Sequence, residues 1–477
     1  MSEMGSAAVV IASNRGPLSF SRDDTGRLVS SRGGGGLVSA MIAAAAAPDT
    51  LWLCAALSDA DREAAASSRG GRIDEAGHDT AGAAVAMLPI DAGVLAGAYT
   101  GISNSTLWSV NHGLLDPVIS FDDAWRRDWS SYVDYNQTFA AAIADLAAVG
   151  ARVLVQDYHL DLVPAALHAL RPDLRIGHFT HTPWATATDF AQLPADVAEA
   201  LLLGVLGADS IGFHSPRWAA DFAACAGAVL GTTYDGEAVV HGDRRVPLRV
   251  HPLGVDAEPL RARAAEPDVS HRLGGLRGLI GAQQVIGRVD RTEPAKNIHR
   301  GLLAIALLFR DHPEHLGHAV HVALAYPSRQ DVAEYRDYTA DCIALAAEIN
   351  AELSTPEWTP VLFNVRDDYA RSLATLRCTD VLLVNSLRDG MNLVAKEGVL
   401  LGDHTVLVLS SETGAADEMG AAALLVDPLD VEATAAALHA ALTMPAAERA
   451  HRHSDLVRSA TAFPPREWLQ AQLDALD

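Results

Sequence analysis

Two consecutive series of short apolar segments, each alternating with longer Ala- and Leu-rich segments, constrain the fold of this 477-residue chain most strongly. The short segments are typical of buried strands, and the longer ones have the length of helices. Strand–helix alternation produces parallel sheets with crossover helices. We therefore predict an α/β protein with two Rossmann-like, doubly wound domains. The predicted strands are Ala8–Ser13, Leu51–Ala55, Ala84–Leu88, Val153–Gln156, Arg175–Phe179 and Ser210–Phe213, then Gln284–Arg288, Ala319–Ala325, Val361–Phe363, Val381–Asn385, Thr405–Leu409 and Ala423–Val426.

The boundary between the two series is predicted near residue 250, where Val246–Val250 leads into an Arg-, Ala- and Glu-rich connection. We predict an N-terminal domain of residues 1–250 and a C-terminal domain of residues 251–455. Residues 456–477 are predicted to be helical, with a break at Pro464–Pro465, and to return to the first domain. Ligands of open α/β sheets bind beyond the carboxyl ends of the strands, so polar residues directly after strands are the candidate site residues.

The composition excludes several classes of function. A net charge of −24 and a pI near 5.1 argue against a nucleic-acid partner, which requires a basic face. No apolar run reaches the ~20 residues of a membrane span, and the N-terminus lacks the basic region of a signal peptide. We therefore expect a cytoplasmic protein with no membrane partner. The four cysteines have no zinc-site spacing and are expected to be packed thiols.

The strongest candidate site follows the predicted strand Val381–Asn385. Gly390 there allows close approach of the backbone to a ligand, and the helix that follows offers free N–H groups to an anion. Glu397, within this helix, could accept hydrogen bonds from two ribose hydroxyls. The alternative is that Asp389 only caps the helix and that Glu397 is solvated. The N–H groups concerned belong to Met391, Asn392 and Leu393.

Two cations follow the predicted strand Gln284–Arg288. Arg291 and Lys296 lie five residues apart around a proline-containing turn, so both can reach one diphosphate. They would then neutralise the charge that develops on a leaving group. The alternative is a surface ion-pair cluster with Asp290 and Glu293.

Histidines at two strand ends of the first series do not predict a metal site. His159, His178 and His181 lack a carboxylate or cysteine that would complete a ligand set, so a hydrogen-bonded or ligand-facing role is expected instead. Asp59 and Asp61 resemble a metal-binding DxD motif but are assigned to the solvated face of a helix. Gly33–Gly36 is weak evidence for a phosphate-binding loop.

Taken together, these segments resemble the trehalose-6-phosphate synthase family, which are retaining glycosyltransferases of the GT-B fold. The run Arg388–Glu397 reads RDGMNLVAKE, almost letter for letter the motif of that family. The family pattern DRLDYxKG is matched with Glu293 for Asp, Pro294 for Tyr and Asn297 for Gly. Shorter matches follow the family's order: Ser13-Asn14-Arg15, Gly35-Gly36-Leu37, Asp157–Leu160 and Asp209–Phe213. The resemblance implies two facing domains with a cleft between them.

The resemblance also implies roles for individual residues. Arg291 and Lys296 would hold the donor diphosphate beside Gly35, Gly36 and the backbone of Met391, Asn392 and Leu393. Glu397 would bind the ribose, and Asp389 a hydroxyl of the donor ring. His181 would lie near the primary hydroxyl of the transferred ring, and Asp157 near the acceptor. The acceptor's phosphate would meet Arg15, Tyr99, Trp108 and Arg329. No metal and no permanently bound cofactor is implied, and a homodimer is possible.

Departures from the family pattern lie in the segments expected to face the sugars. They occur after Trp52, around Trp108, around Trp184 and at His214-Ser215, whereas the diphosphate motifs are kept. This contrast favours a pseudo-glycosyltransferase of the validoxylamine A 7′-phosphate synthase type. Such an enzyme would join GDP-valienol to validamine 7-phosphate through a C–N bond, with GDP as the leaving group. The alternatives are a trehalose-6-phosphate synthase that uses UDP- or GDP-glucose and glucose 6-phosphate, and a non-catalytic sugar-phosphate sensor.

Overall fold

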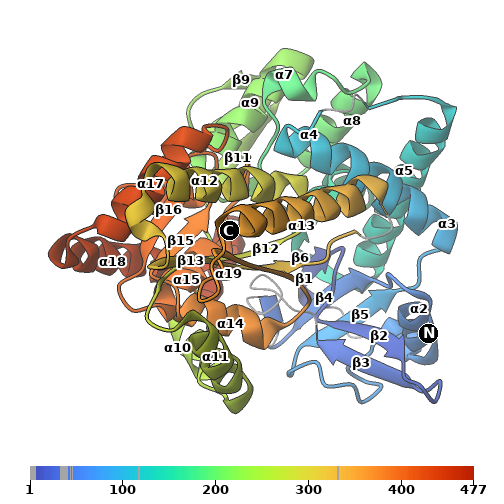
Figure 1. Cartoon of the computed structure of the whole chain (residues 1–477). Coiled ribbons are helices and arrows are strands. Elements are labelled where there is room, and N and C mark those ends of the chain that lie inside the picture. The colour runs from blue at the N-terminus through green and yellow to red at the C-terminus, as the bar shows by residue number, and fades with distance from the viewer. Residues whose placement is uncertain (1–6, 33–40, 43–44, 46, 116–118, 330–331) are drawn as a thin grey trace. The chain divides into compact units, whose positions relative to one another are not determined.

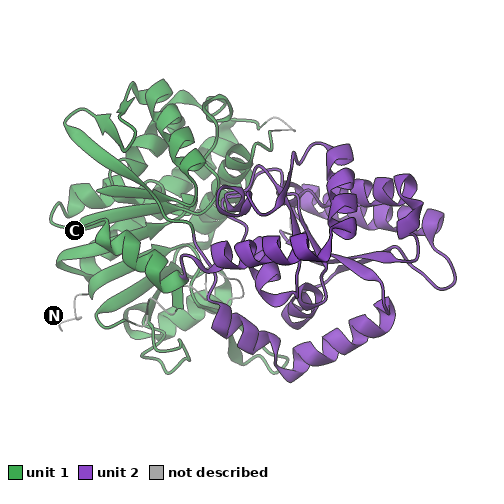
Figure 2. Cartoon of the chain, turned by 90° about the vertical axis from the view of Figure 1, so that its left-hand side faces the viewer, with its two compact units in different colours: residues 1–252, 465–477 green, residues 253–464 purple. Residues whose placement is uncertain are grey.

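The computed structural model describes residues 7–32, 41–42, 45, 47–115, 119–329 and 332–477, in two compact units (Figure 2). Unit 1 comprises Met1–Pro252 and Pro465–Asp477, and unit 2 comprises Leu253–Pro464. The first division thus falls at Pro252, against residue 250 expected from the sequence. The second falls at Pro464–Pro465, so that residues 456–464, which were grouped with the returning helix, belong to unit 2.

Unit 1 contains a nine-stranded sheet in the order β5-β4-β1-β6-β7-β8-β11-β10-β9 (Figure 1). The neighbours from β5 to β11 are parallel, and β10 and β9 extend the edge in antiparallel fashion. Because β1 has β4 and β5 on one side and β6, β7 and β8 on the other, the winding reverses between β1 and β6. The strands are β1 Ala7–Ser13, β4 Thr50–Ala55, β5 Ala84–Leu88, β6 Ala147–Gln156, β7 Arg175–Thr180, β8 Ser210–Phe213, β9 Thr233–Tyr234, β10 Ala238–His241 and β11 Arg244–Val250.

Unit 2 repeats this plan with a six-stranded parallel sheet in the order β14-β13-β12-β15-β16-β17. Its winding reverses between β12 and β15, so the two strands on either side of that point come from segments about ninety residues apart. The strands are β12 Gln284–Arg291, β13 Ala319–Tyr326, β14 Val361–Val365, β15 Val381–Val384, β16 Val406–Ser410 and β17 Leu424–Val426.

Helices cover both faces of the sheet in unit 2, which explains why its strands are mostly apolar. Alternate side chains of β15 enter different cores: Leu382 and Val384 pack with α10, α11, α14, α15 and α18, whereas Val381 and Leu383 pack with α12, α13 and α17. The helices are α10 Ala257–Ala264, α11 Pro267–Ile280, α12 Ile298–Asp311, α13 Ala333–Leu353, α14 Tyr369–Arg377, α15 Leu393–Leu401, α16 Ala415–Met419, α17 Val431–Thr443 and α18 Ala446–Thr461, with short 3-10 turns η4 Pro294–Lys296 and η5 Pro313–His315.

The last helix, α19 (Pro465–Asp474), completes the core of unit 1. The Trp468 side chain is fully buried, and its indole N–H donates to the carbonyl oxygen of His251 at 3.0 Å. The other helices of unit 1 are α2 Asp59–Ser67, α3 Ala92–Leu95, η2 Ala96–Leu107, α4 Trp108–His112, α5 Asp123–Leu146, α6 Val163–Leu170, α7 Ala187–Phe190, α8 Ala195–Val205 and α9 Pro216–Leu230, with 3-10 turns η1 Arg69–Gly71 and η3 Tyr158–Leu160.

The prediction of two Rossmann-like parallel-sheet units is confirmed, and each predicted strand overlaps a strand of the structure. The sequence did not predict the hairpin of β2 (Leu18–Arg22) and β3 (Leu28–Arg32), the π-helical turns of η2 or the short edge strands β9 and β10. Within the described residues, no helix has the length and apolar character that crossing a membrane would require.

The assignment of Asp61 to a solvated helix face is wrong. Its side chain is 4% exposed, accepts from the backbone N–H of Phe20 at 2.6 Å and closes a capping box with Ser58 at the start of α2. Asp61 therefore fastens the β2–β3 hairpin to α2, and its carboxylate is fully used in doing so.

Candidate active site

The predicted diphosphate residues of unit 2 lie on either side of the point where the winding of its sheet reverses. Arg291 is the last residue of β12, Lys296 ends the 3-10 turn that follows, and Asp389 follows β15, the neighbour of β12. The carboxyl ends of parallel strands share one edge of a sheet, and ligands of doubly wound folds bind at this point of that edge. Segments far apart in sequence thus deliver cations and a carboxylate to one place.

Lys296 and Asp389 form the most direct contact of this group. The ammonium nitrogen of Lys296 lies 2.5 Å from Oδ2 of Asp389, and both side chains are about 15% exposed. Burial alone would lower the pKa of Lys296, but Asp389 and Asp290 outweigh it and raise the pKa above its ordinary value. Lys296 is therefore a permanent cation, and its ammonium group carries two further hydrogens that can be donated to a ligand.

Glu293 is a buried carboxylate that interacts with Arg291 and Arg329. Its side chain is fully buried, and Oε1 accepts from Arg291 Nη1 at 2.9 Å and from the Ser328 hydroxyl at 2.6 Å. Burial would raise the pKa of Glu293, yet Arg291 and Arg329 together lower it below its ordinary value. The Arg291 side chain itself stays 49% exposed. The ion pair with Glu293 that was considered as the alternative is therefore present, with a half-exposed guanidinium and a buried carboxylate.

A fully buried arginine supports the turn that carries Lys296. The Arg288 side chain pairs with Asp290 at 2.9 Å, donates to Asn385 Oδ1 and donates to the carbonyl oxygen of Lys296. Asn297, the next residue, has a φ of 57° and donates from Nδ2 to the carbonyl oxygens of Asn385, at 2.9 Å, and Pro428, at 2.7 Å. Side-chain hydrogen bonds of buried groups therefore link the β12, β15 and β17 loops.

Asn392, and not Asp389, caps α15, the helix that begins within this motif. The Asn392 side chain accepts from the N–H of Ala395 at 3.0 Å and donates to Asp389 Oδ2 at 3.0 Å. The first N–H groups of α15, including that of Leu393, are not satisfied by the helix itself, and they lie next to Asp389 in sequence. Gly414 packs so closely on Gly390 that a Cβ would lie 2.0 Å from the carbonyl oxygen, which explains a glycine at that position.

Glu397, one turn into α15, has the properties of a ligand-binding carboxylate. It is half-buried, makes no hydrogen bond or ion pair within the described part of the chain, and burial raises its pKa to about 7. Glu397 is therefore partly buried, and its role in binding a ribose stays a prediction. Lys396, by contrast, is fully buried between Glu418 and the carbonyl oxygen of Leu253, so its place in the motif serves the fold.

In unit 1, two of the predicted acceptor-phosphate residues meet. Arg15 follows β1, and its Nη2 donates to the hydroxyl of Tyr99 at 2.9 Å. The side chain of Arg15 is exposed, and the Tyr99 ring stacks on His159 at 5.8 Å. Trp108 lies against His112 and Tyr158 and is 8% exposed. Arg329, the fifth member of the predicted acceptor set, belongs to unit 2, where its guanidinium lies over the ring of Tyr335.

Asp157 and His181 follow the neighbouring strands β6 and β7, as expected for residues of one sheet edge. Oδ1 of Asp157 accepts from the backbone N–H of His181 at 3.1 Å, and burial raises the pKa of Asp157 to about 6. The φ of Asp157 is 74°, a strained value for a non-glycine residue, which is often found at functional positions. Burial, together with His214, lowers the pKa of His181 well below its ordinary value, so its imidazole is neutral.

The imidazole of His181 is held on both sides. Its Nε2 lies 2.8 Å from Oε1 of Gln156 and its Nδ1 lies 3.2 Å from Nε2 of His214. Gln156 in turn donates to Gln472 of α19 at 3.2 Å. The last helix therefore contributes a hydrogen bond to the residue that orients His181.

Comparison with known proteins agrees with this geometry. Residues 7–477 match the model of glycosyltransferase family 20. The chain belongs to glycosyltransferase family 20. It is 31% identical over 98% of its length to the UDP-forming α,α-trehalose-phosphate synthase of Schizosaccharomyces pombe, of which the match covers 90%. It is 34% identical to the bifunctional trehalose-6-phosphate synthase/phosphatase of Thermoproteus tenax, but the match spans only half of the length of that relative, as it does for a synthase of Dictyostelium discoideum.

Solved structures of the family share the fold. An Escherichia coli structure described as bound with UDP-2-fluoro glucose superposes with a TM-score of 0.84 at 28% identity, and the match covers 98% of both chains. A Burkholderia xenovorans α,α-trehalose-phosphate synthase in complex with glucose-6-phosphate gives 0.83 at 26% identity, over 98% of this chain and 99% of that one. The predicted GT-B fold is thereby confirmed.

The preference for a C–N-forming pseudo-glycosyltransferase is wrong. Relatives matched over at least 98% of this family 20 chain, such as those of Schizosaccharomyces pombe and Aspergillus fumigatus, are UDP-forming trehalose-phosphate synthases. Part of the reason for the error is that several of the divergent side chains are interior. Trp184 is 1% exposed and packs on Phe222 at 4.8 Å, Cys54 and Ala55 are buried, and Asn111 accepts from the N–H of Ala185. These buried side chains pack within unit 1, whereas the divergent His214 contacts His181.

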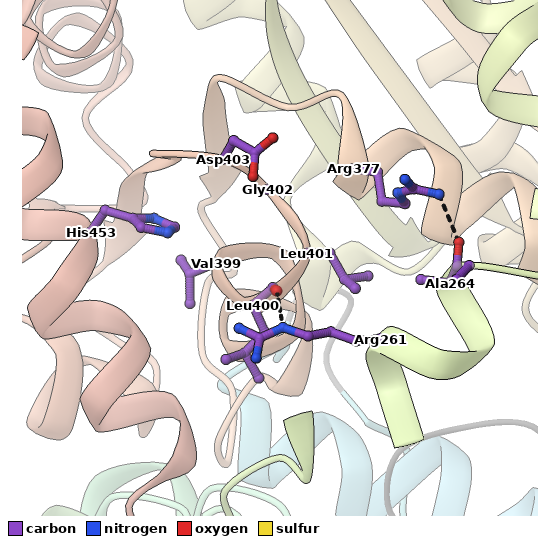
Figure 3. Close-up of a pocket in the computed structure, with 10 residues that line it drawn as sticks. Arg261, Ala264, Arg377, Val399, Leu400, Leu401, Gly402, Asp403 and His453 are labelled. Atoms are coloured by element: carbon purple, nitrogen blue, oxygen red, sulfur yellow. Dashed lines mark hydrogen bonds between the residues drawn. The ribbon is translucent and has the colours of Figure 1, made fainter. Parts of the chain in front are cut away.

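A cavity of unit 2 lies away from this site. It has a volume of about 320 Å³ and lies in unit 2 between α10, the ends of α14 and α15, and α18 (Figure 3). Arg377 and Asp403, which line it, precede β15 and β16, so the cavity lies at the amino edge of the sheet, opposite the edge that carries Lys296. Its arginines are engaged with backbone: Arg261 donates to Leu400 and Arg377 to Ala264.

The structure brings some of the predicted site residues into contact and does not describe others. The structure brings together Lys296 with Asp389, Arg15 with Tyr99, and Asp157 with His181, whereas Gly35 and Gly36 lie outside the described residues. Residues missed from the sequence are Gln156, His214 and Gln472, which hold His181, and Arg288, which supports the Lys296 turn. An arginine and an aspartate at alternate positions of a buried strand, as in Arg288 and Asp290, were an available signal for the second of these.

Proposed function

We propose that the chain is a trehalose-6-phosphate synthase, which transfers glucose from UDP-glucose to glucose 6-phosphate and retains the anomeric configuration. The observation that carries this proposal is the cation pair Arg291 and Lys296 at the reversal point of the unit 2 sheet, with the half-buried Glu397 on the adjacent helix. UDP as the leaving group is inferred from relatives that are described as UDP-forming.

The chemistry follows from the cations. As the bond between C1 of the glucose and the β-phosphate oxygen breaks, Arg291 and Lys296 stabilise the negative charge on the departing diphosphate. The 1-hydroxyl of glucose 6-phosphate attacks C1 from the same face, and its proton passes to the departing phosphate oxygen. Asp389 holds Lys296 and would accept a hydrogen bond from a hydroxyl of the transferred ring. No metal ion is assigned a role in this scheme.

The acceptor is assigned to unit 1. Arg15 is exposed and oriented by Tyr99, so its guanidinium suits the 6-phosphate, and a placed arginine is required for an anion in a chain with a net charge of −24. The neutral imidazole of His181, held by Gln156 and His214, would contact the primary hydroxyl of the donor glucose.

The test is product analysis. The protein is incubated with glucose 6-phosphate and either UDP-glucose or GDP-glucose, and trehalose 6-phosphate and the released nucleotide are quantified. We expect trehalose 6-phosphate with UDP-glucose and a lower kcat/KM with GDP-glucose. The Lys296→Ala variant is the control for background hydrolysis. Binding of glucose 6-phosphate without any transfer from either donor would overturn the proposal and favour a sugar-phosphate sensor.

A further inference from the structure

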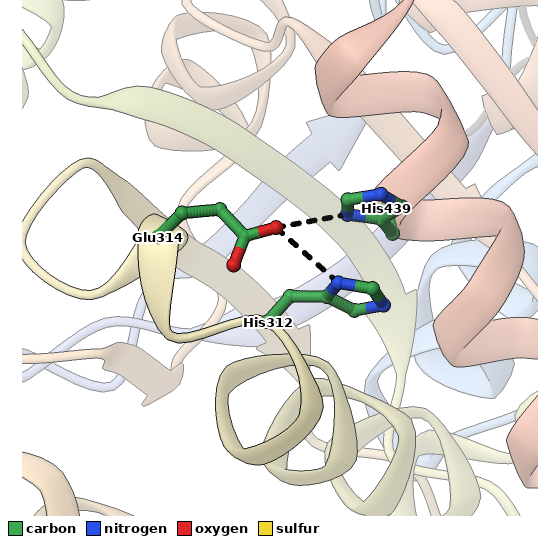
Figure 4. Close-up of side chains that lie close together, drawn as sticks. All are labelled: His312, Glu314 and His439. Atoms are coloured by element: carbon green, nitrogen blue, oxygen red, sulfur yellow. Dashed lines mark hydrogen bonds and ion pairs between the residues drawn. The ribbon is translucent and has the colours of Figure 1, made fainter.

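Two histidines and a glutamate converge in unit 2, away from the residues of the proposed active site (Figure 4). His312 directly follows α12, Glu314 lies in the 3-10 turn η5, and His439 lies in the C-terminal half of α17. The Nδ1 of His312 is 3.3 Å and the Nδ1 of His439 is 3.9 Å from the same oxygen, Oε1, of Glu314. The three side chains come from three elements, so their meeting is a property of the tertiary fold.

The spacing of these atoms matches that of metal ligands. Ligand atoms bound at about 2.1 Å in tetrahedral geometry lie roughly 3.4 Å from one another. The three ligand atoms all lie within 4.8 Å of one another, so small side-chain rotations bring them to that spacing. Two imidazole nitrogens and one carboxylate oxygen form a donor set typical of Zn²⁺ and not of Mg²⁺ or Ca²⁺, which prefer oxygen.

The burial of the cluster suits a site that exchanges with solvent. The side chains of His312 and His439 are about 30% exposed and that of Glu314 is 57% exposed. The two imidazole rings stack at 3.6 Å and 10°, so one ring must turn for both lone pairs to point at one ion. The third histidine, His315, is buried, and its Nε2 lies 3.0 Å from Nδ1 of His439, so binding of an ion by this Nδ1 replaces that hydrogen bond.

We propose that His312, Glu314 and His439 form a Zn²⁺ site that fastens the end of α12 to the end of α17, with water as the fourth ligand. The start of α12 follows Lys296 directly, and Asn297 at that start donates to Pro428, shortly before α17. The two helices are thus joined at one end by the loops of the donor site. The metal joins them at the other end, about 21 Å away along α12. Its role is to stabilise unit 2 and not to take part in the transfer.

The test uses the full chain, without a histidine tag and after treatment with EDTA. Calorimetric titration with ZnCl₂ should show one site, and Zn²⁺ at a hundredfold excess over its dissociation constant should raise the thermal midpoint of unit 2 by about 5 °C or more. Mg²⁺ should give no such shift. Co²⁺ serves as an optical probe, because tetrahedral coordination gives intense visible absorption.

Four variants decide the assignment. His439→Ala and Glu314→Gln should each weaken Zn²⁺ binding at least tenfold and remove the thermal shift. The control is His318→Ala, an exposed histidine outside the cluster, which should bind Zn²⁺ as the wild type does. Absence of Zn²⁺ binding by the wild type would overturn the proposal, as would one-site binding and a thermal shift that persist in the His312→Ala/His439→Ala double variant.

Discussion

Replacement of Glu397 by glutamine should stabilise the ligand-free protein above neutral pH. Burial raises the pKa of Glu397 from 4.5 to about 7, so the folded state disfavours the ionised form by about 3 kcal/mol. Below pH 4.5, Glu397 is protonated in both the folded and the unfolded state and does not lower the free energy of unfolding. As the pH rises through 7, ionisation of the buried carboxylate lowers the free energy of unfolding. Glutamine avoids this loss because it has a similar size and no charge.

The magnitude can be measured by thermal denaturation. At pH 8, the free energy of unfolding of Glu397→Gln should exceed that of the wild type by about 3 kcal/mol, which corresponds to a rise of roughly 6–12 °C in the thermal unfolding midpoint of unit 2. This difference should shrink towards zero near pH 4.5. Glu357→Gln, at an exposed position in the same unit, is the matched control and should show no such dependence on pH. An equal midpoint for Glu397→Gln and wild type at pH 8 would refute the claim that Glu397 is held in a desolvated position.

The same carboxylate should set the pH dependence of donor binding. Hydrogen bonds from two ribose hydroxyls require the ionised form, so the dissociation constant for UDP should rise as the pH falls below about 7 and approach a tenfold rise per pH unit. Glu397→Gln should bind UDP more weakly than wild type at pH 8 and lose this pH dependence. Isothermal titration at pH 6, 7 and 8 measures both effects, and a dissociation constant that does not vary with pH in the wild type would argue against the ribose role.

Three further predictions concern the two units separately. Arg15→Ala should raise the KM for glucose 6-phosphate about tenfold or more, with little change in the KM for the donor. Tyr99→Phe removes only the hydroxyl that contacts Arg15 and should have a smaller effect. Equal effects of Arg15→Ala on both KM values would contradict the assignment. Asn297→Gly relieves a positive φ but removes two buried hydrogen bonds, so it should destabilise unit 2 by about 1–2 kcal/mol in denaturant titrations, and a stabilised variant would show that the φ dominates. Gln472→Ala should lower kcat per folded molecule about fivefold, the equivalent of one hydrogen bond, because Gln472 supports the residue that holds His181. An unchanged kcat per folded molecule would show that only the amount of folded protein had changed.

The parallel arrangement of the strands was predictable because alternating apolar runs and helices leave few other arrangements. The site motifs could be recognised because each directly follows a predicted strand. Arg291 and Asp389 could be placed at one sheet edge because each follows a strand. The hairpin β2–β3 was missed because its residues Ser19, Ser21 and Ser30 are polar and mostly exposed, which weakens the apolar signal of a strand.

Side-chain partners were the part that could not be predicted. The link from His181 through Gln156 to Gln472 joins residues more than three hundred positions apart, and no local pattern marks it. The error about substrate arose in the same way. Trp184 and Ala55 differ from the family pattern, but the sequence does not show that both are buried. In the structure Trp184 packs on Phe222, and Ala55 lies in the interior of the sheet.

The position of α19 has a consequence for synthesis. Unit 1 begins the chain, but its buried Trp468 and Gln472 come last, after all of Leu253–Pro464. At about 5–20 residues per second, a ribosome needs roughly 10–40 s to make the intervening segment. During that interval the Trp468 site beside Phe179 and His251 is uncovered, whereas unit 2 is continuous and can complete its fold first. The unit that is made first is therefore finished second, and chaperones would meet it in that incomplete form.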